Sequence, residues 1–301
     1  MPLLLFAANH ARWCLILGLL AGLTLPGLAA TIKPWLPMLI AGLLFLSALR
    51  IGPKAAFGNL TDIRRTLSIL VVYQVALPLV FLAIFLALGV ASTVAALALV
   101  LLMAGPSVTG SPNFTALMGF DPAPPMRLLI LGTAAFPITV IPVFLLTPGL
   151  GDPGIVIQAA IRLIVVILIA AGVGFAVRLF WQPNVQHIKA IDGASALTLG
   201  VVVIGLMFAV APTLTAEPIT VMKWLALACV VNFGLQFLAY KALKSPGEAI
   251  VAGNRNIALY LVALPVSLTD PLLIFIGCYQ IPMYLTPMLM ARIFGNSPSS
   301  W

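Results

Sequence analysis

Residues 91–118 read ASTVAALALVLLMAGPSVTGSPNFTALM. The first part is apolar enough for a membrane helix, but residues 105–113 contain two glycines, two prolines and several polar side chains. Proline removes a backbone donor and glycine weakens a helix, so this segment cannot keep a regular hydrogen-bond ladder. Lipid offers no partner for the freed amides and carbonyls, whereas a bound solute, ion or water does. The sequence therefore predicts an interrupted membrane helix at a polar site.

The composition of the remaining chain is that of a membrane protein. Hydrophobic residues make up 62% of the 301 positions, charged residues only 7%, and the mean hydropathy is +1.19. A soluble domain carries roughly 25% charged residues, which this chain lacks. Apolar runs of roughly 17–25 residues recur from end to end, and each can cross a hydrocarbon core. We expect an all-α integral membrane protein with one transmembrane domain over residues 1–301.

The apolar runs predict about ten transmembrane helices. Their approximate ranges are 13–30, 35–50, 67–88, 91–118, 126–147, 155–181, 193–213, 218–243, 248–265 and 271–294. We interpret the first run as a helix of the mature protein, because neither a charged leader nor a small-residue cleavage site accompanies it. The runs are continuous rather than alternating, which disfavours a transmembrane β-barrel.

The distribution of Lys and Arg predicts the orientation. With a cytoplasmic N-terminus and ten alternating helices, every basic residue lies on the cytoplasmic side except Lys33, Lys223, Arg162 and Arg255. Such an excess is typical of cytoplasmic loops. We expect both termini in the cytoplasm and the protein in the cell (inner) membrane.

Ten spans divide into two halves of opposite orientation, which predicts two inverted five-helix repeats over residues 1–150 and 151–301. The fourth helix of each half then carries a break, at residues 105–113 and at Ala252–Asn256, which reads AGNRN. Broken helices at matched positions are typical of transporter sites near the bilayer midplane. Ordinary proline or glycine kinks are the alternative interpretation.

Four short motifs carry a family resemblance. They are QVALP at 74–78, SPN at 111–113 followed by FTAL, NFGL at 232–235 and GNRNIAL at 253–259. Their order and spacing resemble the bile acid/sodium symporter family, whose wider superfamily includes arsenite permeases and auxin efflux carriers. The resemblance covers nearly the whole chain. It implies a panel domain of helices 1, 2, 6 and 7 and a core domain in which discontinuous helices 4 and 9 cross. Substrate would bind beside the crossing, and one domain would move against the other.

The chain departs from the family at two positions. Sodium-coupled members carry a glutamate and a glutamine where this chain has Val251 and Arg255. Arginine offers only donors, and two cations about 5 Å apart repel by several kcal/mol even at an effective dielectric near 20. We therefore expect no sodium ion at the second of the family's two sites. The alternative is one reduced sodium site formed by Ser111, Asn113 and Thr133.

Arg255 lies within a membrane helix, where a charged side chain usually faces the protein interior. Its guanidinium can replace a bound cation by bridging backbone carbonyls of the two broken helices. It can also bind an anionic substrate through two parallel hydrogen bonds, and these two roles are compatible. The remaining alternative is an arginine that snorkels to the surface or pairs with Glu248.

Five further polar residues are candidates for substrate binding. Ser111, Asn113, Asn254 and Asn256 lie in or beside the two breaks, where asparagine amides can contact solute or cap helix ends. The resemblance implies that Gln74 faces the core domain, and a simple interhelical hydrogen bond is its alternative role.

The predicted function is a secondary transporter that moves a small organic solute, specifically an organic anion, by alternating access without the usual two sodium sites. The alternatives are a sodium-coupled symporter with one reduced site and a non-transporting membrane sensor. An enzyme is disfavoured, because the aspartates lie near helix ends and no Gly-rich phosphate loop occurs. The expected partners are the solute and the lipid bilayer, without nucleic acid, protein partner, metal or cofactor. Sodium enters only in the symporter alternative.

Overall fold

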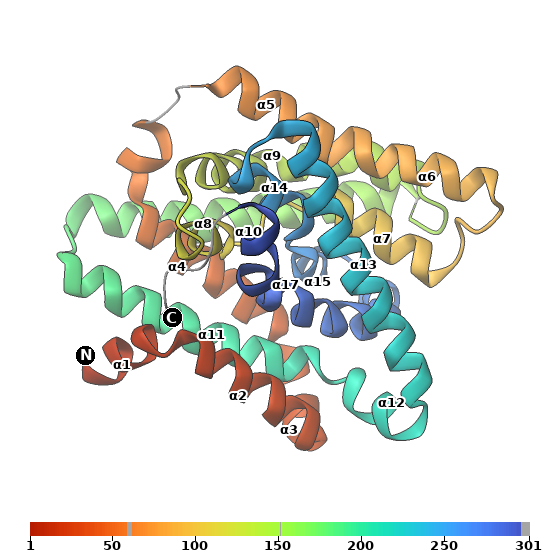
Figure 1. Ribbon diagram of the computed structural model, residues 1–301, viewed down its shortest axis with the longest axis horizontal. Helices are drawn as coiled ribbons and strands as arrows, with labels where there is room; N and C mark the ends of the chain where they lie inside the picture. Colours follow the sequence, from red (N-terminus) through yellow and green to blue (C-terminus); the bar gives the residue numbers. More distant parts are fainter. Residues whose placement is uncertain (59–61, 151, 296–301) are drawn as a thin grey trace. The chain divides into compact units, whose positions relative to one another are not determined.

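The computed structural model describes residues 1–58, 62–150 and 152–295, and all regular structure in these ranges is helical (Figure 1). The α-helices are α1 (Pro2–Asn9), α2 (Ala11–Thr24), α3 (Pro26–Ile32), α4 (Leu36–Gly58), α5 (Ile63–Val71), α6 (Leu77–Ala87), α7 (Val94–Ala104), α8 (Ser111–Leu117), α9 (Ala123–Leu146), α10 (Pro153–Phe180), α11 (Val185–Leu206), α12 (Val210–Ala216), α13 (Pro218–Leu243), α14 (Pro246–Gly253), α15 (Tyr260–Ala263), α16 (Val266–Thr269) and α17 (Leu273–Ile293). Short tighter or wider turns are η1 (Lys33–Trp35), η2 (Val72–Ala76), η3 (Ile257–Leu259) and η4 (Asp270–Leu272). The expectation of an all-α protein is confirmed.

Several helical segments are long and apolar enough to cross a membrane. Within the described residues there are seven: Pro26–Pro53, Ile63–Ala87, Ala123–Leu146, Pro153–Phe180, Val185–Leu206, Pro218–Leu243 and Val266–Ile293. An eighth is obtained if α1 and α2, which meet at 85°, form one bent span. These lengths are those of an integral membrane protein, as the composition predicted.

Ten spans were expected, two of them interrupted, and the described residues hold seven unbroken spans, or eight if α1 and α2 form one. The expected helices 91–118 and 248–265 are each divided, so that α7 has 11 residues and α14 only 8. The first expected helix, 13–30, also divides, because Pro26 begins α3 and its missing N–H ends the preceding hydrogen-bond ladder. The boundary expected at 150/151 between two repeats falls on Gly151, which lies outside the described residues.

The chain forms two compact units, each assembled from segments far apart in sequence. Unit 1 comprises Met1–Leu60, Ile164–Met222 and Ala258–Gly277. Unit 2 comprises Thr61–Leu163, Lys223–Ile257 and Cys278–Trp301. Both broken helices predicted from the sequence have their breaks in unit 2.

Close helix packing through glycine characterises unit 1. A Cβ atom added to Gly18 of α2 would lie 2.5 Å from the carbonyl oxygen of Gly200 in α11. One added to Gly193 would lie 1.8 Å from the carbonyl oxygen of Leu4 in α1. Small residues allow backbones to approach this closely in membrane proteins. An ion pair between Lys33 and Asp270, 2.8 Å apart, joins η1 to η4.

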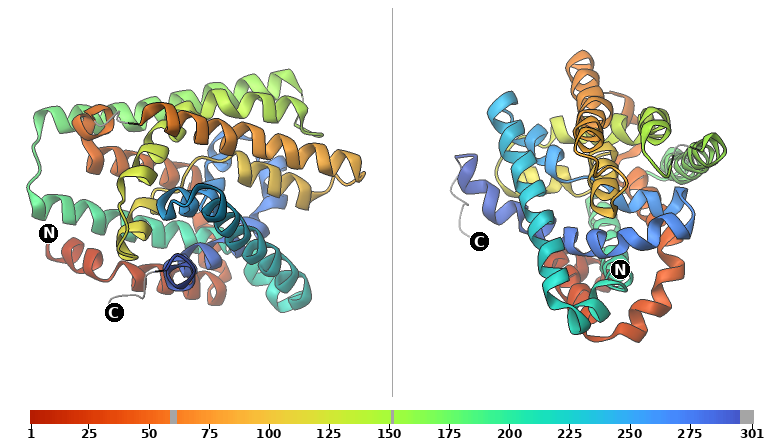
Figure 2. Two further views of the ribbon diagram at one scale, coloured as in Figure 1. Left: turned by 45° about the horizontal axis from the view of Figure 1, so that its top comes forward. Right: turned by 90° about the vertical axis from the view of Figure 1, so that its right-hand side faces the viewer.

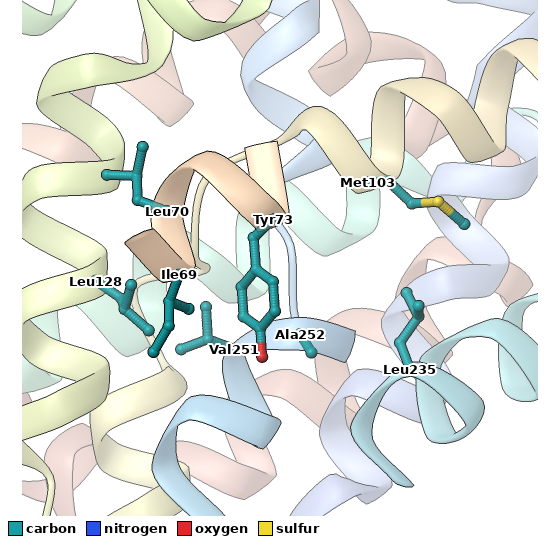
Figure 3. Packing of buried hydrophobic residues seen from close by; sticks show 8 residues of the cluster. All are labelled: Ile69, Leu70, Tyr73, Met103, Leu128, Leu235, Val251 and Ala252. Carbon is teal, nitrogen blue, oxygen red and sulfur yellow. The ribbon is translucent and has the colours of Figure 1, made fainter. Parts of the chain in front are cut away.

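In unit 2, α6 and α7 run side by side (Figure 2), and α14 packs against α8 and α9 (Figure 1). Figure 3 shows one buried apolar cluster of this unit: Ile69, Leu70, Tyr73, Met103, Leu128, Leu235, Val251 and Ala252. The helix from Ile63 to Ala87 contains one wide π-type turn, η2. Its cause is local, because Pro78 lacks the N–H that would bond the carbonyl of Gln74 one turn earlier.

Candidate functional site

Two helices are broken within the predicted stretches 105–113 and 252–256, although residues 111–113 and 252–253 are helical. α7 ends at Ala104 and α8 begins at Ser111, while α14 ends at Gly253 and η3 begins only at Ile257. The connecting segments, residues 105–110 and 254–256, are not helical. We call these two segments together the crossover.

Backbone hydrogen bonds join the two segments of the crossover. The Val108 amide donates to the Asn254 carbonyl at 3.0 Å, and the Asn256 amide donates to the Pro106 carbonyl at 2.8 Å. The pairing is antiparallel and is centred on Ser107 and Arg255. Each break therefore satisfies part of the backbone that the other leaves without a helical partner, as burial away from water requires.

The Arg255 guanidinium lies at the C-terminal ends of both interrupted helices. Its Nε donates to the Ala252 carbonyl at 3.1 Å, and its Nη1 donates to the Gly105 carbonyl at 3.2 Å. Its Cζ lies 4.5 Å from the centre of the Tyr73 ring. The last carbonyls of a helix lack internal partners and carry partial negative charge, so a cation is stabilised there. This is the geometry expected of an arginine that bridges the two broken helices.

Snorkelling, one of the alternatives for Arg255, is wrong, because only 2% of the residue is exposed. Glu248, the acidic residue expected as another partner, forms an ion pair with Arg65 of α5 at 2.7 Å. Glu248 is itself buried, and its carbonyl accepts a hydrogen bond of 3.1 Å from the Tyr73 hydroxyl. The start of α14 is thus tied to the helix from Ile63 to Ala87.

Gln74 makes interhelical hydrogen bonds. Its Nε2 donates to the Gly132 carbonyl at 3.1 Å, and its Oε1 accepts from the Thr139 hydroxyl at 2.8 Å. A Cβ at Gly132 would lie only 2.9 Å from Nε2, so the missing side chain makes room for the amide. Gln74 thus holds η2 against α9, which is the alternative role that the sequence left open for it.

Asn254 caps α14 and joins a polar network. Its Nδ2 donates to the Ile250 carbonyl at 2.8 Å, and its Oδ1 accepts from the Thr286 hydroxyl at 3.3 Å. The residue is fully buried. Of the two roles considered for Asn254, capping is therefore the one that its contacts support.

Four buried residues behind the crossover were not among the predicted site residues: Asn232 and Gln236 on α13, and Tyr279 and Thr286 on α17. The Asn232 amide and the Tyr279 hydroxyl both donate to the carbonyl of Gly253. The Gln236 amide donates to Asn232 Oδ1 at 2.7 Å and to Thr286 Oγ1 at 3.1 Å. A sequence signal existed, because spacings of four and seven residues place each pair on one helix face.

The remaining candidates differ in their burial. Ser111 is fully buried at the start of α8, and its hydroxyl has no hydrogen-bond partner in the part of the chain that the structure describes. Asn113, two residues later, is exposed, and Thr133 on α9 is half-buried. Asn256 is half-buried, and its backbone amide is one of the donors of the crossover. A sodium site shared by Ser111, Asn113 and Thr133 stays a prediction.

The chain matches no protein-family model and none of the curated proteins with which it was compared. The structure places three of the four motifs that carry the resemblance in or directly beside the crossover: residues 111–113, 232–235 and 253–259. The fourth, 74–78, contains Gln74 and lies against α9.

Val251 occupies the position at which the resemblance implies a carboxylate. It is 2% exposed and belongs to the apolar cluster of Figure 3, together with Ile69 and Leu128. The environment is therefore built for a methyl-bearing side chain rather than for an ion ligand. Among the described residues, no group of three or more His, Cys, Asp or Glu side chains could hold a metal ion.

Proposed function

We propose that the protein is a secondary transporter of the bile acid/sodium symporter type, which moves a small organic anion by alternating access without the usual two sodium sites. The observation that carries the proposal is the buried Arg255 guanidinium, which donates to one carbonyl from each interrupted helix. Arginine stays charged at every physiological pH. It therefore supplies a cation that cannot dissociate.

The carbonyls used by Arg255 bear on the coupling ion. A sodium ion between two broken helices needs a shell of oxygens, whereas here the Gly105 and Ala252 carbonyls accept from the guanidinium. Val251 adds no carboxylate. Sodium and the guanidinium would compete for the partial negative charges of the same carbonyls. This supports a carrier in which the Arg255 guanidinium, rather than a sodium ion, holds the two segments of the crossover together.

The charge of Arg255 also supports an anionic solute. A buried charge is costly in a membrane protein, and an anion nearby lowers that cost. The nearest acidic residue in sequence, Glu248, is already paired with Arg65. We propose that the solute lies near Arg255, with Ser111, Asn113 and Asn256 as polar neighbours. Gln74 and Asn254 support the crossover, because their amides already bind protein groups.

The two compact units support the finer architecture that the resemblance implies. Unit 1 contains residues 1–60 and 164–222, which hold the expected panel helices 1, 2 and 7 and most of helix 6, whose residues 155–163 belong to unit 2. Unit 2 contains most of the expected core, including both breaks. Residues 258–277 depart from this scheme because they belong to unit 1. Ten spans in two inverted repeats, with cytoplasmic termini, complete the proposed architecture.

A thermal-shift screen of the purified protein against small organic anions, in sodium and in potassium salts, tests the proposal. A ligand at a hundred times its dissociation constant stabilises the folded state by about 2.7 kcal/mol. We expect at least one anion to stabilise the protein equally in both salts. We also expect proteoliposomes that contain the protein to take up that anion in the absence of sodium. Stabilisation or uptake that requires millimolar sodium would overturn the sodium-independent mechanism.

A sodium-coupled symporter with one reduced site is the second candidate. The observation that favours it is the buried Ser111 hydroxyl, which has no protein partner within the described residues. In that case Ser111→Ala should abolish a sodium-specific thermal shift of the wild-type protein. A wild type without such a shift argues against this candidate.

A further inference from the structure

Tyr73 contacts two groups in the segment that begins with α14, and these lie seven residues apart. The Arg255 guanidinium lies over its ring, with 4.5 Å from Cζ to the ring centre. Its hydroxyl donates to the Glu248 carbonyl at 3.1 Å. Tyr73 is 6% exposed, so both contacts are made away from solvent.

The ring and the two carbonyls hold the guanidinium in complementary ways. Ala252 and Gly105 accept hydrogen bonds from Nε and Nη1, which lie along the edge of the planar group. The Cζ atom at the centre of the group lies over the face of the Tyr73 ring. A guanidinium can donate from separate nitrogens to two carbonyls while its carbon lies over an aromatic ring, and the compact ammonium group of lysine lacks this fixed fork of donors. The contact with the ring is strengthened by burial, because water does not compete for the cation.

The position of Tyr73 depends on the wide turn of its own helix. Tyr73 lies in η2, the π-type turn over Val72–Ala76. In Figure 3 its side chain points toward the segment that carries Val251 and Ala252. Without the wide turn, the helix before it would be rotated about the helix axis by roughly 100° relative to the helix after it, which is the angle of one helical residue. The turn thus sets which residue faces Arg255.

We propose that Tyr73 is the positioning residue of the crossover, whose aromatic ring keeps the Arg255 guanidinium in place between the carbonyls of Gly105 and Ala252. The proposal deepens the proposed function, in which Arg255 is the permanent cation of the site. It makes the ring the essential part of the side chain, and it makes the hydroxyl bond to Glu248 secondary.

A double-mutant cycle on the full-length protein in detergent tests this proposal without any solute. We expect Tyr73→Phe to melt close to the wild type, and Tyr73→Leu to lower the melting temperature by about 5 °C. In an Arg255→Met background, Tyr73→Leu should lower it by less than half as much. Leu70→Ala, in the same apolar cluster, is the control and should have equal effects in both backgrounds.

Hydrogen exchange provides a readout that general packing loss would not move. The amides of Val108 and Asn256 are bonded across the crossover. Tyr73→Leu should make peptides covering these two residues exchange at least tenfold faster, whereas Leu70→Ala and Tyr73→Phe should leave them unchanged. If Tyr73→Leu does not fold, Tyr73→Trp, which keeps an aromatic face, should preserve slow exchange.

Two results would overturn the role of Tyr73: equal effects of Tyr73→Leu in both Arg255 backgrounds, or damage by Tyr73→Phe as large as that by Tyr73→Leu. Neither result depends on transport. If positions 73 and 255 are coupled as expected but no anion binds in the screen, the proposed function is refuted and the role of Tyr73 stands. If an anion binds but the two positions are not coupled, the role of Tyr73 is refuted and the proposed function stands.

Discussion

A single arginine in this protein makes contacts that no other residue type could reproduce. Arg255 donates from Nη1 to the carbonyl of Gly105, 150 residues away in the sequence, and from Nε to the carbonyl of Ala252, 3 residues away. The first acceptor directly follows α7, and the second lies in the last turn of α14. Its charge is stabilised by the partial negative charge of two helix ends and by an aromatic face. The residue therefore combines structural support with the proposed electrostatic role.

Arg255→Lys should be destabilising although the charge is kept. Lysine presents a compact ammonium group without the fixed fork of donors that reaches both carbonyls beside the Tyr73 ring, so at least one carbonyl loses its charged donor. We expect a loss of about 1–3 kcal/mol in the free energy of unfolding, measured as thermal or denaturant unfolding in detergent. Arg64→Lys is the matched control, because Arg64 is exposed on α5. A variant as stable as the wild type would mean that charge alone is required at position 255.

At the level of elements, α13 and α17 hold α14 from behind through polar side chains. Gly253 lies at the centre of this contact, because its carbonyl accepts from both Asn232 and Tyr279. The backbone of α13 approaches so closely that a Cβ at Gly253 would lie 2.2 Å from the carbonyl oxygen of Asn232. The end of α14 therefore depends on the absence of a side chain at this position.

Gly253→Ala should disrupt the crossover. The added methyl group would meet the Asn232 carbonyl oxygen at 2.2 Å and the Gln236 Cγ at 2.6 Å, and the backbone contact cannot be relieved unless α13 and α14 separate. We expect a loss of about 1–3 kcal/mol or failure to fold, measured as melting temperature and as the monodisperse fraction in size-exclusion chromatography. Gly234→Ala is the control on α13, since nothing lies within 4 Å of the added atom. That variant should be neutral or slightly more stable, because alanine favours a helix. Equal behaviour of the two variants would contradict the close approach.

At the scale of the whole molecule, the proposed independence from sodium rests on two positions of one segment. Val251 supplies no carboxylate, and Arg255 occupies carbonyls that could face an ion. Removing the guanidinium alone frees oxygens without adding negative charge, and adding a carboxylate alone gives it a neighbouring arginine as its partner. Both changes are therefore needed to create a cation site.

The double variant Val251→Glu/Arg255→Gln should acquire a sodium-specific thermal shift, whereas Arg255→Gln alone should not. The wild type should melt at the same temperature in sodium and potassium chloride. Saturating sodium at a hundred times its dissociation constant would stabilise the double variant by about 2.7 kcal/mol. A wild type that is already stabilised by millimolar sodium, but not by potassium, would show that the guanidinium does not stand in for the ion.

The helical membrane fold and both breaks could be predicted without tertiary information, because they depend on local properties. Apolar runs of membrane-spanning length follow from the composition of each segment. Residues 105–110 are not helical, because proline lacks a backbone N–H donor and glycine destabilises a helix. These effects act wherever the residues lie in the fold. The division of α2 from α3 at Pro26 has the same cause, although one continuous helix was expected over residues 13–30.

The partners of the polar side chains were decided by tertiary structure. Gln74 meets Thr139 across 65 residues, and Glu248 meets Arg65 across 183. Sequence patterns carry no information about which of several buried polar groups will face one another at such separations. The cost of burying an unpaired group in a low-dielectric interior favours pairing of Gln74 and Glu248, and packing of the helices determines which partner lies within reach.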